Sequence, residues 1–276
     1  MFNIQYLSHV GFFRWTARSF ARQWYKRIAR VEHSMILPSG ASFLLPLNSH
    51  LASEAYVSGG DIDIGSEAIF YSLISSGAVV YDVGANVGYY SVYLSPKVAK
   101  CYAFEPSVRT GKILNRVIAD YSNIKHVAKA VSSKSGQATF YDEPDMEVSG
   151  LRASSSAARA VEVEVITLDE FSKLESERVD AIKIDVEGFD FEVLVGARQL
   201  IERDQPLVLT EAKMDIGLTQ FAKNSGYRIF ANVWRNGRSR TVELFQPGID
   251  TKMIFLVPQR LNGAFEELVA KSGLST

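Results

Sequence analysis

The stretch VVYDVGANVGYYSVYL, residues 79–94, decides the fold of this chain. Its apolar run reaches an acid, Asp82, and then places Gly84, Asn86 and Gly88 at alternate positions. A buried strand that passes through a loop of small residues into a helix leaves backbone N–H groups free to hold a ligand. A plain glycine turn between strand and helix is the alternative. The spacing does not satisfy the G-x-G-x-x-G fingerprint of dinucleotide-binding folds, so it favours another kind of ligand loop.

The second predicted strand, KCYAFE at residues 100–105, points to a nucleoside ligand. It ends in Glu105, and Pro106 follows as a residue that can start a helix. An acid at this place can accept hydrogen bonds from both ribose hydroxyls, and it would repel a 2′-phosphate. A solvated surface glutamate is the alternative. Together with the preceding loop, Glu105 indicates a cofactor with an unmodified ribose, either NAD or S-adenosylmethionine.

Strands and helices alternate along the middle of the chain. Hydrophobic periodicity predicts further strands at 124–131, 161–168, 179–186 and 206–212, and helices after Gly88 and at 107–121, 189–202 and 217–225. This alternation is typical of βαβ units and a mostly parallel sheet. Three more strands follow without long crossovers and predict an antiparallel edge, at 227–234, 241–245 and 252–258.

The N-terminal part departs from this rhythm. Residues 1–66 are predicted to form an elaboration with a basic helix and two short strands around Pro38, Ser39 and Gly40. Residues 67–276 are predicted to form the α/β domain, because no linker-like stretch separates the alternating elements from the antiparallel edge.

Composition limits the classes of function. With 47% hydrophobic and 22% charged residues, the 276-residue chain can bury a sizeable core. The net charge of −1 gives no reason to expect a nucleic-acid partner. A single cysteine, Cys101, allows no internal disulfide and fits a reducing compartment. Neither a transmembrane segment nor a signal peptide is predicted, so the expected location is cytoplasmic.

Five motifs along residues 78–215 together resemble the FkbM family of S-adenosylmethionine-dependent methyltransferases. They are VVYDVGANVGYYS, YAFEPS, AVSSKSGQATFY, ITLDEF and VDAIKIDVEGFDFEVLVGA, and they occur in the family's order. The resemblance implies a Rossmann-like class I methyltransferase fold, with a seven-stranded, mostly parallel sheet whose seventh strand is reversed. It also implies S-adenosylmethionine as the cofactor.

The resemblance also implies which residues surround the cofactor. The loop residues Asp82, Gly84, Ala85, Asn86 and Gly88 would surround its methionine part. In the same way, Glu105 with Pro106 would bind the ribose. The end of the third strand, at Lys129, Ala130 and Val131, looks like the wall beside the adenine.

Three carboxylates at strand ends are the candidates for catalysis. Asp185 ends the fourth strand beside the expected methyl position, Glu187 lies in the loop that follows, and Glu211 ends the fifth strand. Asp185 or Glu187 can act as a general base toward a hydroxyl. Alternatively, the three can hold a divalent cation, or Glu187 can cap the helix that starts near Phe189. The base is favoured and no metal site is assigned. Lys183, in the same strand, can pair with one of these acids, but the favoured interpretation is that it reaches solvent.

Two other segments have open interpretations. His126 is interpreted as a satisfied strand histidine rather than a base. The Ser- and Ala-rich segment 149–160 is interpreted as a mobile loop, which can serve as a lid or as a passive surface.

Residues 11–30 form a predicted basic amphipathic helix. Arg14, Arg18, Arg22 and Lys26 lie on one half, and the opposite stripe is apolar, with Phe13, Ala17, Phe20, Trp24 and Ile28. Such a helix can lie on an anionic membrane surface, here the inner one. The alternatives are packing of the stripe on the protein's own core or on a second copy in a homo-oligomer.

These observations favour an S-adenosylmethionine-dependent O-methyltransferase. Relatives that resemble FkbM act on hydroxyls of sugars, polyketides or lipid-linked glycans, so a small-molecule, glycan or glycolipid acceptor is expected. An NAD-dependent oxidoreductase and a non-catalytic nucleoside-binding scaffold are the alternatives. The missing dinucleotide fingerprint counts against the oxidoreductase.

Overall fold

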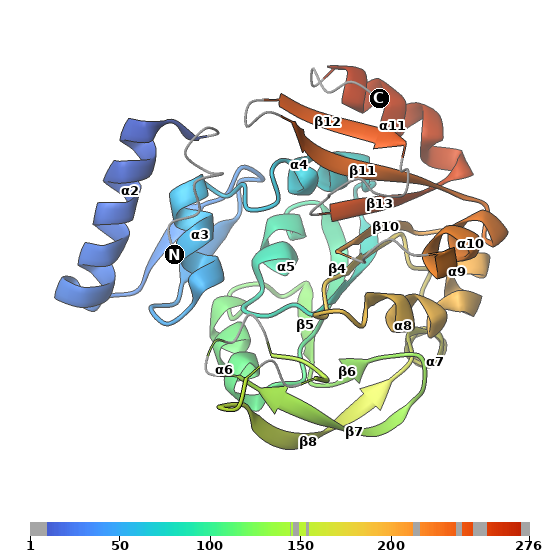
Figure 1. Ribbon diagram of the computed structural model, residues 1–276, viewed down its shortest axis with the longest axis horizontal. Helices are drawn as coiled ribbons and strands as arrows, with labels where there is room; N and C mark the ends of the chain where they lie inside the picture. The colour runs from blue at the N-terminus through green and yellow to red at the C-terminus, as the bar shows by residue number, and fades with distance from the viewer. Residues whose placement is uncertain are drawn as a thin grey trace.

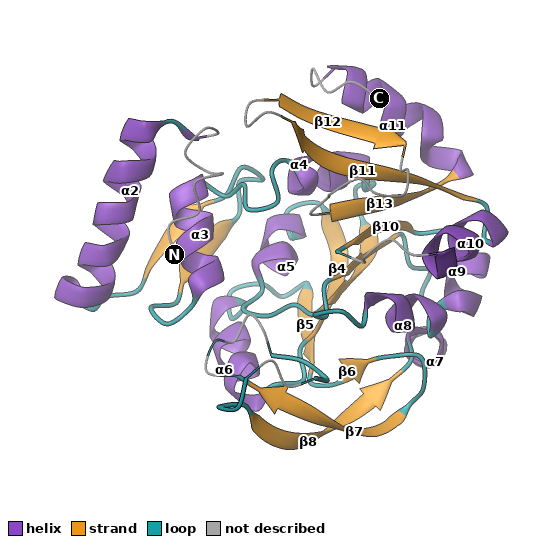
Figure 2. Cartoon of the chain, in the orientation of Figure 1, coloured by secondary structure: helices purple, strands orange, loops and turns teal. Residues whose placement is uncertain are grey.

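The computed structural model describes residues 10–143, 145, 149–152, 155–211, 216–235, 239–244 and 253–271. A twisted central sheet has helices on both faces, with a helical N-terminal region at one end and a smaller sheet along one side (Figure 1). Figure 2 shows that the two sheets lie apart, joined by loops and helices.

Within the described ranges, the central sheet has eight strands in the order β12-β11-β13-β10-β9-β3-β4-β5. Their bounds are β3 Ala78–Val83, β4 Val98–Phe104, β5 Ile124–Val127, β9 Ala181–Ile184, β10 Leu207–Thr210, β11 Tyr227–Arg235, β12 Ser239–Leu244 and β13 Met253–Pro258. The five strands from β10 to β5 pair in parallel, and β13 runs antiparallel to both of its neighbours. The predicted class of fold, a mostly parallel sheet with a reversed strand near the end, is confirmed. The family resemblance implies seven strands, and the eighth is β12 at the edge, which pairs with β11 and corresponds to the strand predicted at 241–245.

Both faces of the parallel strands are buried, which explains their nearly continuous apolar sequences. In β3, Val80 packs into one apolar cluster and Tyr81 and Val83 into another. The first cluster includes side chains from α4 (Ser66–Leu73), α5 (Tyr89–Leu94), α6 (Val108–Val117) and α11 (Asn262–Lys271). The second includes side chains from α7 (Leu168–Glu175), α8 (Asp190–Val195), α9 (Arg198–Asp204) and α10 (Ile216–Asn224). The helices therefore cover the two faces as a doubly wound sheet requires.

The prediction of a single strand at 124–131 is wrong, because this stretch forms two strands. The chain turns after β5, where the Lys129 N–H donates to the Val127 carbonyl at 2.8 Å. The remaining residues form β6 (Ala130–Val131) in a separate three-stranded sheet with β7 (Gly136–Asp142) and β8 (Arg159–Ile166). The strand predicted at 161–168 corresponds to β8, and its last residue instead begins α7. Hydrophobic alternation marks a strand but does not say which sheet it joins.

The helix predicted at 189–202 is two helices, α8 and α9, separated at Gly196 and Ala197. A Cβ atom at Gly196 would lie 2.2 Å from the carbonyl oxygen of Ser132. The backbone between β6 and β7 therefore lies directly against the junction of α8 and α9, and only glycine allows so close an approach.

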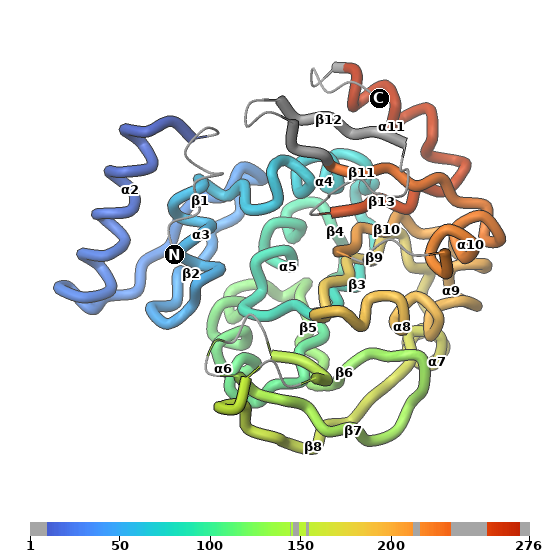
Figure 3. The backbone as a smooth tube through the Cα atoms, in the orientation of Figure 1, coloured from blue at the N-terminus to red at the C-terminus, as the bar shows by residue number. Residues whose placement is uncertain are grey.

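The N-terminal region consists of α2 (Phe12–Trp24), a π-helical turn (Tyr25–Ala29), the hairpin strands β1 (His33–Ile36) and β2 (Ser42–Leu45), and α3 (His50–Ser58). The predicted helix and hairpin are confirmed, whereas α3 and α4 were not predicted. In Figure 3 the chain runs from α2, at the outer edge, through the hairpin and α3 toward the sheet. Phe43, Leu45 and Ala55 belong to the same apolar cluster as Val80 of β3, so this region shares the core of the sheet.

Buried polar contacts tie the segment 60–67 to the sheet domain. The Tyr89 hydroxyl donates to the Gly60 carbonyl at 3.0 Å and to Glu67 Oε1 at 3.1 Å, and the Tyr90 hydroxyl donates to Asp63 Oδ2 at 2.6 Å. From β11, the Asn232 side-chain amide donates to the Asp63 carbonyl at 3.0 Å. Burial, followed by repulsion from Asp63 and Asp61, raises the pKa of Glu67 to about 8. Glu67 is therefore held as a neutral acid at neutral pH.

Replacement of Glu67 by Gln should reduce the pH dependence of stability. Because the pKa of Glu67 is higher in the folded than in the unfolded protein, its contribution to stability is complete below about pH 4.5. This contribution is lost as the pH rises through about 8. The difference in the free energy of unfolding, Glu67→Gln minus wild type, should therefore increase as the pH rises between these two values. The increase should be at most about 1.4 kcal/mol per pH unit. Urea unfolding at pH 5 and pH 8 measures the gain. The exposed Glu202→Gln is the control, and a difference that stays constant with pH would contradict the assignment.

Candidate functional site

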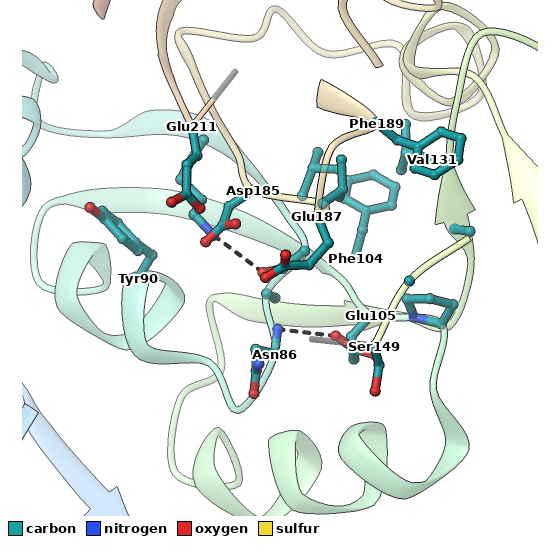
Figure 4. Close-up of a pocket in the computed structure, with 18 of the residues that line it drawn as sticks. Asn86, Tyr90, Phe104, Glu105, Val131, Ser149, Asp185, Glu187, Phe189 and Glu211 are labelled. Carbon is teal, nitrogen blue, oxygen red and sulfur yellow. Dashed lines mark hydrogen bonds and ion pairs between the residues drawn. The ribbon is translucent and has the colours of Figure 1, made fainter. Parts of the chain in front are cut away.

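A pocket lies at the carboxyl ends of β3, β4, β9 and β10, where open parallel sheets bind ligands. Eleven of the predicted site residues line it: Gly84, Ala85, Asn86, Glu105, Pro106, Lys129, Ala130, Val131, Asp185, Glu187 and Glu211. The other two, Asp82 and Gly88, are not among the lining residues. In Figure 4, Asp185, Glu187 and Glu211 gather at one end and Asn86 and Glu105 lie at the other. The structure thus brings the predicted cofactor and catalytic residues to one cavity.

Asp82 lies beneath the pocket floor and is fully buried. Its Oδ2 accepts a hydrogen bond from the Ser91 hydroxyl at 2.6 Å, and its Oδ1 is 3.7 Å from Lys183 Nζ. Burial is the main reason why its pKa is raised, and attraction to Lys183 offsets part of that effect. Asp82 therefore supports the loop from below, a different position from the ligand contact that was expected.

Lys183 does not reach solvent as predicted; its side chain is 5% exposed. Its Nζ lies 3.4 Å from Asp185 Oδ2 and donates to the Gly84 carbonyl at 3.2 Å. Burial by itself lowers the pKa of the ammonium, but attraction to Asp185 and Asp82 outweighs it, so the pKa is raised. One buried cation thus connects the strand under the loop, the loop itself and a pocket carboxylate.

The loop after β3 approaches β9 closely. Gly84 has φ 75°, and a Cβ atom there would lie 1.8 Å from the Asp185 carbonyl oxygen. Gly88 has φ 88° and begins α5, and a Cβ atom on it would lie 2.7 Å from Leu114 Cδ1. Both positions therefore require glycine for backbone reasons. Gly88 sets the packing of α5 on α6, which explains its place outside the pocket lining.

Glu105 is 7% exposed at the end of β4. Its Oε2 accepts the Asn86 N–H at 3.1 Å (Figure 4), and its Oε1 accepts the Ser107 N–H at 2.9 Å. Burial raises its pKa to about 7, although both of these hydrogen bonds oppose the shift. The two backbone donors fix the carboxyl group in one orientation at the pocket wall, and each oxygen retains a lone pair for a ligand hydroxyl.

His126 is confirmed as a satisfied strand histidine. Its Nε2 lies 2.9 Å from the Glu105 carbonyl oxygen and its Nδ1 lies 3.1 Å from Asn115 Oδ1. It therefore supports the backbone of β4 at Glu105 and does not line the pocket.

The acids at the opposite end differ in their surroundings. Asp185 is ion-paired with Lys183, whereas Glu187 lies on an exposed turn with φ 49°. Although the residue is exposed, the surrounding protein partly desolvates its carboxyl group, and this desolvation with repulsion from Asp185 and Asp190 raises the pKa of Glu187 to about 7. Among the described residues, no side chain caps the first turn of α8, whose acids are Asp190 and Glu192. The capping alternative for Glu187 is therefore not observed.

The metal alternative also finds no support in the arrangement of side chains. Within the described part of the chain, no three His, Cys, Asp or Glu side chains are placed as a group that could hold a metal ion. Asp185, Glu187 and Glu211 line the same pocket but do not form such a group.

Sequence patterns did not predict the wall that closes the pocket opposite the sheet. It comes from the N-terminal region, with Leu51 and Glu54 on α3 and Ile62 and Asp63 in the next loop. The close spacing of acids in DIDIGSE, residues 61–67, was the available signal. Residues 149–151 of the predicted mobile loop also line the pocket, and residues 153–154 of that loop lie outside the described ranges.

Comparison with known proteins identifies the sequence family. The model of the Methyltransferase FkbM domain matches residues 82–244, more than half of the chain. The hexuronic acid methyltransferase AglP of Haloferax volcanii is 25% identical over 168 residues, which cover 55% of this chain and 69% of that protein.

Two solved structures to which this chain is similar come from different organisms. One is the methyltransferase FkbM from Methylobacillus flagellatus, at 13% identity and a TM-score of 0.45, over 74% of this chain and 52% of that one. The other is Aeropyrum pernix fibrillarin in complex with S-adenosyl-L-methionine, at 16% identity and a TM-score of 0.40, over 66% of this chain and 67% of that one. The chain thus spans about half the length of the M. flagellatus protein.

Replacement of Lys183 by Met should destabilise the fold, because Asp82 would remain buried without its cation. Breaking a buried ion pair in this way costs about 3–5 kcal/mol. Chemical unfolding measures the loss, and the exposed Lys112→Met should change stability by less than about 0.5 kcal/mol. The double variant Asp82→Asn/Lys183→Met should recover part of the loss, since neither buried charge remains. A loss no larger than that of the control would show that the pair does not support the loop.

Proposed function

The chain belongs to the FkbM methyltransferase family, and we propose that it transfers a methyl group from S-adenosylmethionine to a hydroxyl of a sugar, glycan or glycolipid. The observation that carries the proposal is one pocket with a fixed carboxyl group at the end of β4 and a second group of acids at the ends of β9 and β10. The first end suits a nucleoside, and the second suits an acceptor that must lose a proton.

The cofactor end is supported by its shape and its polar groups. Gly84 and Ala85 bring the backbone close to a ligand, and Glu105 presents oxygens suited to a ribose diol. Ala130 and Val131, with Lys129, line the side where an adenine would lie. These residues fit S-adenosylmethionine without a metal or a second nucleotide half. When bound, this cofactor supplies a methyl group attached to a positively charged sulfur. The sulfur is the leaving group and keeps the electrons of the carbon–sulfur bond.

The acceptor end provides a candidate base. Glu187 has a pKa of about 7, so near neutral pH it is ionised in a large fraction of molecules and still basic enough to take a proton. It would accept the hydroxyl proton as the acceptor oxygen bonds to the methyl carbon. Asp185 is held by Lys183 at 3.4 Å, which suits it to position the acceptor or the cofactor. We therefore assign the base to Glu187 and a positioning role to Asp185, with Glu211 at the rim.

A sugar acceptor is supported by the relative that acts on such a compound. AglP is described as a hexuronic acid methyltransferase, and it matches this chain over 55% of its length. The pocket's acids, exposed at Glu187 and Glu211, can accept hydrogen bonds from several hydroxyl groups at once. An acceptor rich in hydroxyls therefore fits this end of the pocket.

Calorimetry with S-adenosylmethionine, S-adenosylhomocysteine and NAD tests the cofactor. Both sulfur nucleosides should bind and NAD should not. Glu105→Ala should weaken their binding by roughly 1–3 kcal/mol, because a charged hydrogen-bond acceptor is lost. The exposed Glu202→Ala is the control, and melting curves verify that each variant is folded. A folded wild-type protein that binds neither sulfur nucleoside would refute the proposal, and an unchanged dissociation constant in Glu105→Ala would remove the ribose role.

Glu187→Gln should retain cofactor affinity and reduce methyl transfer by roughly 10²–10⁴-fold, the usual contribution of a general base. Wild-type turnover should rise with pH through about 7 and level off above it, because the base must be ionised. That dependence should disappear in the variant. Uptake of labelled methyl groups by a panel of glycans and lipid-linked sugars provides the assay, with Glu202→Gln as the matched control. A variant that changes only KM would place Glu187 in acceptor binding.

A further inference from the structure

Helix α2 has its apolar side chains on the outside of the molecule. Four of the five residues in the predicted apolar stripe are large and highly exposed: Phe13 at 86%, Phe20 at 73%, Trp24 at 53% and Ile28 at 70%. A helix at the surface of a globular protein normally turns this stripe toward the core. Packing on the protein's own core, one of the alternatives from the sequence, is therefore not what the structure shows. In Figure 1, α2 is the outermost helix at its end of the molecule.

Specific polar contacts hold the helix in this inverted orientation. Arg22 is 1% exposed, and its guanidinium donates to the carbonyls of Leu45 at 3.3 Å and Pro46 at 2.6 Å. One turn away on either side, Arg18 donates to the Val57 carbonyl at 3.4 Å and Lys26 to the Ser53 hydroxyl at 3.4 Å. Rotation of α2 to bury its aromatic residues would break these hydrogen bonds and leave the buried donors and acceptors without partners. The outward stripe is thus part of the fold.

The charges beside the apolar stripe indicate which kind of surface fits against it. Residues 11–30 contain five arginines and a lysine and no acidic residue. Arg14, Arg27 and Arg30 are exposed with the stripe, while Arg18, Arg22 and Lys26 point toward the protein. A second copy of this face would bring arginines against arginines without a compensating acid. An apolar surface that carries negative charge satisfies both the aromatic residues and the arginines.

We propose that residues 11–30 dock on an anionic lipid surface, with α2 lying in the plane of the interface. Phe and Trp side chains are typical of this depth, where the ring is apolar and the surroundings are partly hydrated. Exposed arginines would meet the lipid phosphates, each adding to the attraction. Among the described helices none is both long and apolar enough to cross a bilayer, which agrees with a helix that rests on the surface.

Docking would also fix the orientation of the pocket toward the bilayer, because α2 and α3 would lie between the pocket wall and the lipid surface. Helix α3, on which α2 packs, contributes Leu51 and Glu54 to the pocket wall. An acceptor sugar attached to a membrane lipid would then lie on the same side of the protein. This consequence rests on the proposed function, whereas the docking itself does not.

Sedimentation with vesicles tests the docking in the absence of cofactor and acceptor, so that its failure is distinct from failure of the methyl transfer. The full chain should bind vesicles of phosphatidylcholine with phosphatidylglycerol and should bind pure phosphatidylcholine weakly. Phe13→Ser/Phe20→Ser/Trp24→Ser should lower partitioning by at least about ten-fold, because three side chains lose their apolar burial. Arg14→Gln/Arg27→Gln should lower binding to the anionic vesicles by roughly five-fold per arginine and leave binding to neutral vesicles unchanged.

The matched control removes exposed apolar side chains elsewhere on the surface. Val108→Ser/Leu174→Ser/Val195→Ser should bind vesicles as the wild type does, since these residues lie on other helices. Melting curves should be similar for all variants, because each replaced side chain is exposed. Equal binding by the wild type and the aromatic triple variant would overturn the proposal. The proposal would also be overturned if the wild-type protein did not bind vesicles and formed a dimer, while the aromatic triple variant was monomeric.

Discussion

The buried ammonium of Lys183 lies between two carboxylates and a loop carbonyl, and the pocket depends on that arrangement. Asp82 and Lys183 are partners in the register of β3 and β9, on the same face of the sheet. Neither charge is stable in the core alone, and the attraction between the two offsets the cost of removing each from water. Because Lys183 also contacts Asp185 and the Gly84 carbonyl, the same cation sets the loop that would approach a cofactor and the acid that would face an acceptor.

The N-terminal region contributes to the site as well as to the fold. Tyr90 of α5 donates to Asp63 at 2.6 Å, and the Tyr90 ring lies 5.2 Å from Lys183 Nζ. The wall formed by residues 51–63 is therefore connected through one tyrosine to the charge pair under the pocket. Asn232 fastens the same loop to β11 on the far side. This region thus contributes to the shape of the pocket.

The two sides of this N-terminal region serve different surroundings. Its inner side contributes Leu51, Glu54, Ile62 and Asp63 to the pocket, while its outer side presents aromatic residues with arginines. A soluble domain does not gain stability from an exposed stripe of Phe and Trp, so the stripe is best understood through what it binds. The exposed stripe lies on α2, which packs on α3, and α3 also contributes to the pocket wall.

Local patterns were sufficient for much of the fold and of the cofactor end. The run at 79–94, the acid at Glu105 and the strand ends at Asp185 and Glu211 could be placed from the sequence, because strand periodicity and loop composition are short-range properties. The separation of β5 from β6 could not, since the same alternation suits either sheet. Nor could the burial of Lys183, which requires Asp82 directly across from it. Periodicity showed that α2 has two faces, and only tertiary packing, through Arg22 and the carbonyls of Leu45 and Pro46, decided which face points outward.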